Sequence, residues 1–352
     1  MVNRRSVGDG RDSDGASNAP KQVHRRPLIA GTLVALLCVC AVIAICRVLA
    51  PRNLAMVGLG AMSPLAAILA GVAVVLCLSI IAQRRAPVVG WALLLGVALL
   101  ILNLVWLAPS VGGGQPPRPP GAVPVRVMSI NMLGGRADAA QIVRAAQRGD
   151  VDVLVATEIT DGGLRNLHDA GVSGVLPYRY GQAAPSPAGT MVFLRERAEH
   201  ILPLRTRLVA VALTTSIRSH PVRLLAAHPA APTDFELWRS DLDTISEAVH
   251  DRSVDLLVGD LNATTDNKPL RDVMARGRYR DAAELANIGW EPTFPANGVR
   301  RRLGIPIPAI LPLDHVLVRD DGGADRVRLV HIAGTDHAGV IADIWIPATE
   351  RT

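Results

Sequence analysis

The sequence predicts three membrane-spanning helices followed by one α/β domain, in which two β-sheets pack face to face with helices outside. Two observations predict this fold class. Long apolar runs fill residues 28–50, 54–83 and 88–108. From about residue 125 onward, many short apolar strands alternate with a few amphipathic helices, as in layered α/β domains.

The apolar runs predict a membrane anchor over residues 28–108. Each run is close to or above the roughly 20 residues that a helix needs to cross about 30 Å of hydrocarbon. None of the runs has a polar face, which argues against a soluble helical hairpin. A cleaved signal peptide accounts for the first run at most. Ionisable residues lie only near the ends of the runs, which favours an anchor over a transport path.

Basic residues around the runs predict the orientation of the anchor. The tail before the first run contains Arg4, Arg5, Arg11, Lys21, Arg25 and Arg26. Arg84 and Arg85 follow the second run, whereas Arg118 alone follows the third. Basic residues that flank membrane helices are enriched on the cytoplasmic side. We therefore expect a cytoplasmic N-terminus and a domain outside the cytoplasmic membrane. Arg47 and Arg52, in the first loop, weaken this prediction slightly.

The remaining segments are assigned by composition. Residues 1–27 are polar and predict a disordered cytoplasmic tail, residues 109–124 a Gly/Pro linker, and residues 347–352 a C-terminal tail. The folded domain is expected over 125–346. All four cysteines precede it, which excludes a disulfide framework or a cysteine metal site there. The net charge of +6 is mild and lies partly in the tail, so it does not indicate nucleic-acid binding.

The hydrophobic pattern predicts the elements of the domain in order. A helix face repeats at Ala139, Ile142, Val143 and Ala146. Thr233 and Glu236 form a capping box, which predicts a second helix whose core face is Leu237, Leu242, Ile245 and Val249. Strands are expected at 125–130, 151–156, 189–194, 208–213, 222–227, 254–258, 315–318, 326–332 and 340–346.

Polar residues of catalytic types stand at the ends of these strands. They are Asn131, Glu158, His228, Asp260, Asn262 and Asp314, with Asp336 and His337 just before the last strand. Strand ends at one edge of a sheet converge in space, so residues far apart in the sequence can form one site.

This set of residues suits metal-assisted phosphate hydrolysis. Glu158 is a hard oxygen ligand for Mg²⁺ or Mn²⁺. Asp260 can take a proton from the attacking water, and Asn262 points to the same side of an extended chain and can orient that water.

The histidines complete the set. His337 and His228 can donate hydrogen bonds to a developing oxyanion. Asp314 can hold a histidine in the right tautomer and raise its pKa.

Each residue also has a structural alternative. Glu158 can be a solvated strand end, Asp260 and Asn262 a capping turn, and His228 an ordinary strand terminus. His315 is interpreted as structural. The joint occurrence of the motif residues in this order favours a site.

The ordered set resembles the endonuclease/exonuclease/phosphatase superfamily over about residues 125–346. This family includes DNase I-like nucleases, abasic-site endonucleases, neutral sphingomyelinases and inositol-polyphosphate phosphatases. The Gly-Asp-x-Asn motif at Asp260 and Asn262, followed by a terminal Asp336-His337, is the specific part of the match. Leu133 departs from it, because the nucleases usually carry an acidic or polar residue there.

The resemblance implies a four-layer α/β sandwich and a divalent metal. It implies Glu158 as the principal metal ligand, with Asn131 and Asp336 nearby. Asp260 is then the base and Asn262 the orienting group. His337 is paired with Asp314, and His228 contacts the scissile phosphate.

Two further features are candidate substrate contacts. Trp290 lies in an aromatic loop shortly before Asp314 and is a candidate wall for a base or a lipid. Arg300, Arg301 and Arg302 suit phosphates or anionic headgroups. A packed surface loop and a solvated basic loop are the structural alternatives.

We therefore expect a metal-dependent phosphoesterase that acts outside the membrane with Mg²⁺ or Mn²⁺. Its substrate is a lipid headgroup, a nucleotide or a nucleic acid, and the tether near the bilayer favours a lipid or envelope phosphoester. An extracytoplasmic nuclease and a non-catalytic, membrane-anchored binding module are the alternatives. No obligate protein partner is evident.

Overall fold

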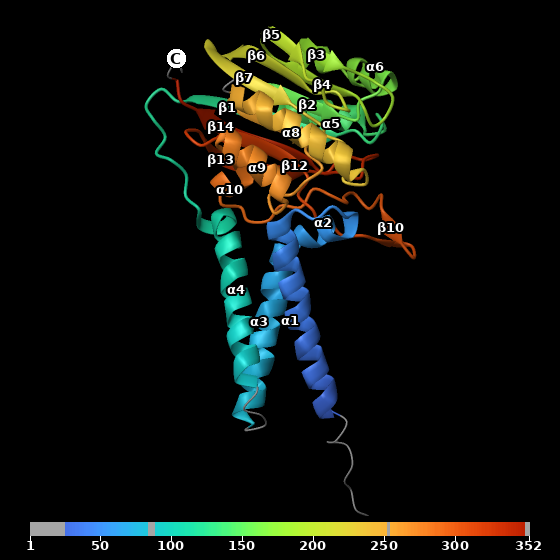
Figure 1. Cartoon of the computed structure of the whole chain (residues 1–352). Helices are drawn as coiled ribbons and strands as arrows, with labels where there is room; N and C mark the ends of the chain where they lie inside the picture. The colour runs from blue at the N-terminus through green and yellow to red at the C-terminus, as the bar shows by residue number, and fades with distance from the viewer. Residues whose placement is uncertain (1–24, 84–88, 252–253, 349–352) are drawn as a thin grey trace, which may run out of the picture.

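The computed structural model of the chain describes residues 25–83, 89–251 and 254–348 (Figure 1). Almost all of the predicted tail, 1–27, lies outside the described residues, as do Arg84, Arg85 and residues 349–352.

Three apolar helices leave one side of the α/β domain (Figure 1). Among the described residues, those long and apolar enough to cross a membrane span Ile29–Leu49, Ser63–Ala82 and Val89–Gly112. They belong to α1 (Arg25–Leu49), α3 (Ser63–Ala82) and α4 (Val89–Gly112). Small and apolar side chains such as Cys40, Ala70 and Cys77 are buried between them. The three predicted apolar helices are confirmed.

The second apolar run forms two helices, where one was expected. A short helix, α2 (Leu54–Gly60), precedes α3 and lies across the ends of α1 and α3, directly beneath the domain (Figure 1). Asn53 caps α2, because its Oδ1 accepts the Ala55 N–H at 2.9 Å. A proline in the first turn of α3 suits a helix that starts anew. Hydropathy alone does not distinguish a short helix such as α2 from part of a helix that spans the membrane.

The third run also extends further than expected. The helix α4 continues through Pro109 to Gly112, so the first residues of the predicted linker are helical. Near this end, the carbonyl of Ser110 accepts the Gly289 N–H at 2.8 Å. A contact from the domain therefore satisfies one of the carbonyls that a helix end leaves free.

Two six-stranded sheets form the centre of the domain. The strands β1–β2 and β7–β8 are parallel, and the other neighbours are antiparallel. The first sheet has the order β13 (Gly323–Val330), β14 (Gly339–Ile346), β1 (Val123–Asn131), β2 (Val153–Thr157), β4 (Thr190–Leu194), β3 (Tyr178–Gln182). The second has the order β5 (Ala198–Pro203), β6 (Val211–Ile217), β7 (His220–Ala226), β8 (Leu256–Asp260), β12 (Asp314–Arg319), β9 (Tyr279–Asp281). A separate hairpin pairs β10 (Arg301–Arg302) with β11 (Ile305–Pro306).

Helices cover both outer faces of the sheet pair, which confirms the four-layer sandwich. Val127, Val258 and Val316 belong to the core between the sheets. A second core packs the first sheet against α5 (Ala139–Arg148), α6 (Asp161–Asp169) and α7 (Val172–Val175). A third packs the second sheet against α8 (Phe235–Asp251) and α9 (Lys268–Gly277). The short α10 (Ala282–Leu285) contacts β13 and α4.

The expected capping box of α8 is wrong by one residue. Asp234 caps the helix, because its Oδ1 accepts the Leu237 N–H at 3.2 Å. The core face shifts accordingly: Leu237 is 38% exposed and Trp238 only 1%. Trp238 precedes the buried Leu242 by four residues, which matches the helical repeat, whereas Leu237 precedes it by five.

Candidate active site

A cavity of about 370 Å³ lies where the strand ends of both sheets meet. The strand β1 ends in Asn131, β8 ends in Asp260, and β2 ends one residue before Glu158. The strand β12 begins with Asp314, which pairs with Asp260 in the antiparallel register. The polar lining of the cavity includes Glu158, Asp260, Asn262, Arg300, Asp336 and His337.

Asp260 lies at the centre of the hydrogen-bond network and is 1% exposed. Its Oδ1 accepts the Asn262 N–H, and its Oδ2 accepts Nδ2 of Asn131, both at 2.9 Å. The Nε2 atoms of His228 and His337 lie 3.6 and 3.7 Å from Oδ2. Burial raises the pKa of Asp260, but the two imidazoles and the hydrogen bonds from Asn131 and Asn262 outweigh burial, so the pKa lies below its ordinary value. Asp260 is thus ionised and faces two imidazoles.

A glycine permits the approach of the strands that carry His228 and Asp260. Gly259 has φ +148°, and a Cβ there would lie 2.0 Å from the carbonyl oxygen of Ala227. Any side chain would therefore push β7 and β8 apart at the site.

His337 is a buried histidine held in its charged form. Its Nδ1 lies 2.8 Å from Oδ2 of Asp314. Burial lowers the pKa of His337, but the carboxylates of Asp314 and Asp260 outweigh it and raise the pKa to about 10. The ring packs against Phe294, with 4.9 Å between centroids, and Asn297 Nδ2 donates to the backbone carbonyl of His337 at 2.7 Å. The imidazolium therefore has a fixed position in the cavity.

Asn262 reaches the site through a turn, so the expectation of an extended chain was wrong. The residue has φ +48°, in the left-handed region, and the Asp260 side chain bonds its backbone N–H. Its Nδ2 lies 3.1 Å from Nε2 of His228 and donates to the carbonyl of Pro229 at 3.0 Å. The turn therefore places the amide beside the imidazole.

Glu158 is also in the left-handed region, with φ +52°. Its Oε1 accepts Nδ2 of Asn131 at 3.1 Å, and its Oε2 accepts Oγ of Ser186 at 3.2 Å. The Oδ1 of Asn131 accepts the Leu133 N–H at 2.8 Å. Asn131 therefore turns its amide donor toward the carboxylates of Glu158 and Asp260, and its predicted place at a metal stays a prediction.

Asp336 is 1% exposed and carries a free ligand atom. Its Oδ2 lies 2.6 Å from Nε of Arg300, whereas its buried Oδ1 has no hydrogen-bond partner within the described part of the chain. The carboxylates of Glu158 and Asp336 line the same cavity. These oxygen donors and the orphaned Oδ1 fit a hard divalent cation such as Mg²⁺ or Mn²⁺.

Asp260, Asp314 and His337 also offer ligand atoms within 4.8 Å of one another. A metal ligand must be a neutral imidazole, whereas the pKa of about 10 keeps His337 protonated. The cluster therefore suits a protonated His337 beside two carboxylates better than it suits a bound metal ion.

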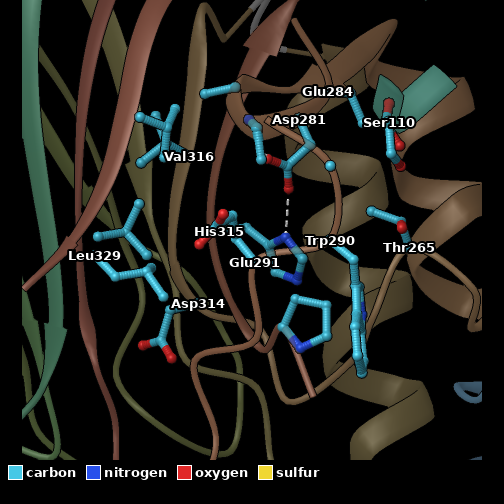
Figure 2. A pocket seen from close by; sticks show the side chains of 16 residues that line it. Ser110, Thr265, Asp281, Glu284, Trp290, Glu291, Asp314, His315, Val316 and Leu329 are labelled. Carbon is cyan, nitrogen blue, oxygen red and sulfur yellow. Dashed lines mark hydrogen bonds and ion pairs between the residues drawn. The ribbon is translucent and has the colours of Figure 1, made fainter. Parts of the chain in front are cut away.

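The four predicted substrate contacts lie at different places in the structure. Arg300 lines the cavity. Arg301 and Arg302 are exposed on β10 and are not part of the cavity wall. Trp290 lines a second, smaller cavity, where it lies beside His315 and Thr265 (Figure 2). Phe294 from the same loop lines the larger cavity, so Trp290 as a substrate contact stays a prediction.

His315 belongs to this second cavity and makes structural bonds, as interpreted from the sequence. Its Nδ1 lies 2.6 Å from Oδ2 of Asp281, the contact drawn in Figure 2, and its Nε2 lies 2.8 Å from the Ala263 carbonyl. Burial lowers the pKa of His315, but the hydrogen bond and charge of Asp281 outweigh it, so the net shift is upward.

Sequence reasoning missed Ser186 and the residues of α2 that line the cavity. Ser186 stands in no motif. The only signal in the sequence at Leu54, Val57 and Gly58 is their apolar character, which predicted a membrane-spanning segment.

Comparison with known proteins gives one family and a set of similar folds. The model of the endonuclease/exonuclease/phosphatase family matches residues 128–337. No curated protein matches the chain. The structure of D. rerio TDP2 complexed with single strand DNA product is 13% identical, with a TM-score of 0.52, and covers 63% of this chain and 98% of its own. The structure of SmcL is 14% identical, with a TM-score of 0.51, and covers 64% and 99%. At these identities the likeness concerns the fold alone.

Proposed function

Because this chain belongs to the endonuclease/exonuclease/phosphatase family, we propose that it is a membrane-anchored hydrolase of phosphoric esters. The family includes metal-dependent phosphoesterases and nucleases. One observation supports the proposal above the others: the ionised Asp260 faces the protonated His337, with 3.7 Å between Oδ2 and Nε2, in a cavity that also holds two further carboxylates.

Asp260 is the proposed base. Its carboxylate is ionised at neutral pH and can accept the proton of a water that attacks phosphorus. The Asn131 amide and the Asn262 backbone hold both carboxylate oxygens in place. Water can therefore be oriented without any rearrangement of the base.

His337 is the proposed proton donor. Asp314 bonds its Nδ1, so the N–H at Nε2 points toward Asp260 and the space where a phosphoryl group would bind. Nε2 of His228 lies 3.6 Å from Asp260 Oδ2 and 3.1 Å from Nδ2 of Asn262, and both side chains are proposed donors to phosphoryl oxygens. Arg300 can add a positive charge at the rim.

Glu158 and Asp336 are the residues that would hold Mg²⁺ or Mn²⁺, and Asn131 orients Glu158. When bound, the cation neutralises negative charge on the phosphoryl oxygens. The ion pair with Arg300 neutralises one oxygen of Asp336 and leaves Oδ1 available.

The test uses the full chain in detergent micelles with bis-p-nitrophenyl phosphate. We expect turnover with Mg²⁺ or Mn²⁺, none with EDTA, and a loss of roughly a thousandfold in Asp260→Asn. Asp325→Asn is the matched control, since Asp325 is half exposed in an ion pair with Arg118. Full activity of Asp260→Asn would sink the proposal. Saturable binding of the ester without turnover in the wild type would favour a binding module.

The anchor is proposed to sit in the cytoplasmic membrane with the domain outside. The support is the basic tail before α1 and the apolar character of α1, α3 and α4. A Glu199→Cys variant carries its thiol on the exposed β5, and all native cysteines lie in α1 and α3. A membrane-impermeant maleimide should label this variant in intact cells; labelling only after lysis would reverse the orientation.

A further inference from the structure

The membrane segment supplies part of the catalytic cavity. Leu54, Val57 and Gly58 of α2, together with Ala61, line the same space as Asp260 and His337. The domain continues this surface with Leu133, Phe294, Leu311 and Leu313. The cavity is therefore polar at the strand ends and apolar where it meets the anchor.

Buried polar contacts hold this apolar wall in place. Nδ2 of Asn267 donates to the carbonyl of Val57 at 3.1 Å. Nε of Arg47, at the end of α1, lies 2.7 Å from Oδ1 of Asp266, and Nη2 of Arg271 donates to the carbonyl of Arg47 at 2.7 Å. Val57 is itself part of the core beneath the second sheet. The anchor and the domain thus contribute to one site and are held together by these contacts.

The hairpin of β10 and β11 has the composition of a membrane contact. Leu303 in its turn is 96% exposed and Ile305 on β11 is 69% exposed, next to the exposed Arg301 and Arg302 on β10. Figure 1 shows β10 at the level of α2, on the side of the domain from which the helices leave. Apolar tips beside basic residues suit the boundary between acyl chains and anionic headgroups. Arg300, at the base of this hairpin, lines the catalytic cavity.

From these features we propose that the substrate is a membrane lipid with a phosphoester headgroup. The inference rests on the proposed function. The lipid enters from the bilayer surface between α2 and the hairpin of β10 and β11. Its apolar part lies against α2, and its phosphoryl group lies at Asp260 and His337.

The chemistry balances as a hydrolysis. The oxygen of water bonds to phosphorus while the P–O ester bond breaks. Asp260 receives the proton of the water, and the leaving oxygen takes the proton of His337. The products are an alcohol and a phosphate, one of which remains attached to the lipid.

Gly58 offers a direct test of the apolar wall. A Cβ at Gly58 meets nothing within 4 Å, and Gly58 lines the cavity, so Gly58→Phe is a means of reducing the cavity space at the apolar wall. Gly71→Phe is the matched control, because Gly71 is equally open but lies in the membrane helix α3.

The assay uses the full chain in nanodiscs that contain phosphatidylglycerol, phosphatidylinositol, cardiolipin, phosphatidic acid and polyprenyl phosphate. Released headgroups and inorganic phosphate are measured beside bis-p-nitrophenyl phosphate turnover. We expect hydrolysis of at least one lipid. Gly58→Phe should lower the ratio of lipid to small-ester turnover about tenfold, and Gly71→Phe should leave it as in the wild type.

The outcomes separate the two proposals. Turnover of the small ester with none of any lipid, or an unchanged ratio in Gly58→Phe, would overturn the lipid inference and leave the phosphoesterase standing. Absence of turnover on every ester would overturn the function itself. Faster cleavage of an oligonucleotide than of any lipid would assign a nuclease.

A pair of charge-introducing variants tests the proposed membrane contact of the hairpin. Ile305→Glu should lower lipid turnover several-fold, because it places a charge where an apolar side chain meets the bilayer. Ile201→Glu makes the same change at a residue that is 44% exposed on β5, at the far end of the domain (Figure 1). Equal effects of the two variants would contradict a membrane-contacting hairpin.

Discussion

Asp314 lies directly opposite Asp260 on the antiparallel strands β12 and β8, and the two carboxylates hold His337 between them. The pairing is set by the sheet itself, so the distance between the charges does not depend on a flexible loop. Asp314 orients the imidazolium, and Asp260 is the carboxylate proposed as the base.

Replacing Asp314 should change the pH profile of the enzyme. With the carboxylate present, the pKa of His337 is about 10, so the proton needed for catalysis stays in place up to that pH. In Asp314→Asn this support is lost, the pKa falls, and the alkaline limb of kcat/KM moves to lower pH. We expect a loss of about ten- to a hundredfold at pH 9, measured from pH 6 to 11.

Asp281→Asn is the matched control for this profile. It breaks a similar Asp–His pair, with 2.6 Å between Asp281 and His315, outside the catalytic cavity. Stability should fall while the alkaline limb keeps its position. A parallel shift in both variants would indicate a general effect of charge.

Glu158→Gln should weaken metal binding. The variant keeps the shape of the side chain but removes the charge that a hard cation needs. We expect the Mn²⁺ concentration for half-saturation to rise at least tenfold, or about 1.4 kcal/mol, when free Mn²⁺ is followed by electron paramagnetic resonance. Glu199→Gln, on the exposed strand β5, is the control. Unchanged Mn²⁺ affinity would remove Glu158 from the metal site.

Glu284 should make stability depend on pH. Burial, with a contribution from Asp281, raises its pKa from 4.5 to about 7. Between these values the folded chain keeps a proton that the unfolded chain has released, so stability falls as pH rises through this interval. Glu284→Gln should therefore raise stability by about 1–2 kcal/mol above pH 7 and change nothing near pH 4.5.

Thermal unfolding of the full chain in detergent at several pH values measures this effect. Glu291→Gln is the control, because Glu291 lines the same smaller cavity as Glu284 and Trp290. A Glu284→Gln variant that gains equally at all pH values would argue against titration as the cause.

The contact between anchor and domain can be measured by a double-mutant cycle. Arg47 and Asp266 are 11% and 15% exposed, so either single change leaves a charge poorly solvated. We expect Arg47→Met or Asp266→Asn to cost about 2 kcal/mol each, and the double variant to cost less than the sum. The readouts are thermal unfolding and protease cleavage in the linker after α4. Additive costs would show that the pair does not couple the two parts.

The sequence allowed most of the domain to be predicted, because its central strands are continuous apolar runs. The edge strands β3, β5 and β9 were missed. The exposed faces of β3 and β5 carry polar residues, Gly181 interrupts the pattern, and β9 spans only Tyr279–Asp281. Among the site residues, those at strand ends were placed together by topology alone. The left-handed turn at Glu158 was not foreseeable, since glutamate rarely adopts this conformation, whereas Asn262 is of a residue type that adopts it more often.

The aromatic loop and the anchor show a different limit. Trp290 and Phe294 are four residues apart, and composition cannot tell which one turns toward His337. The apolar residues of α2 are equally compatible with a membrane-spanning segment and with the wall of a cavity. Only the contact of Asn267 with Val57 of α2, and that of Arg47 at the end of α1 with Asp266 of the domain, distinguish the two roles.

The short helix α2 has one more consequence. A protease that cut the linker after α4 would still leave α2 with the membrane, so the shed domain would leave behind part of its own cavity wall. With the proposed lipid substrate, the activity would be confined to two dimensions: the supply of lipid would be counted per unit area, and the rate would follow its mole fraction in the leaflet. Diluting the surrounding medium would leave that fraction, and hence the rate per cell, unchanged.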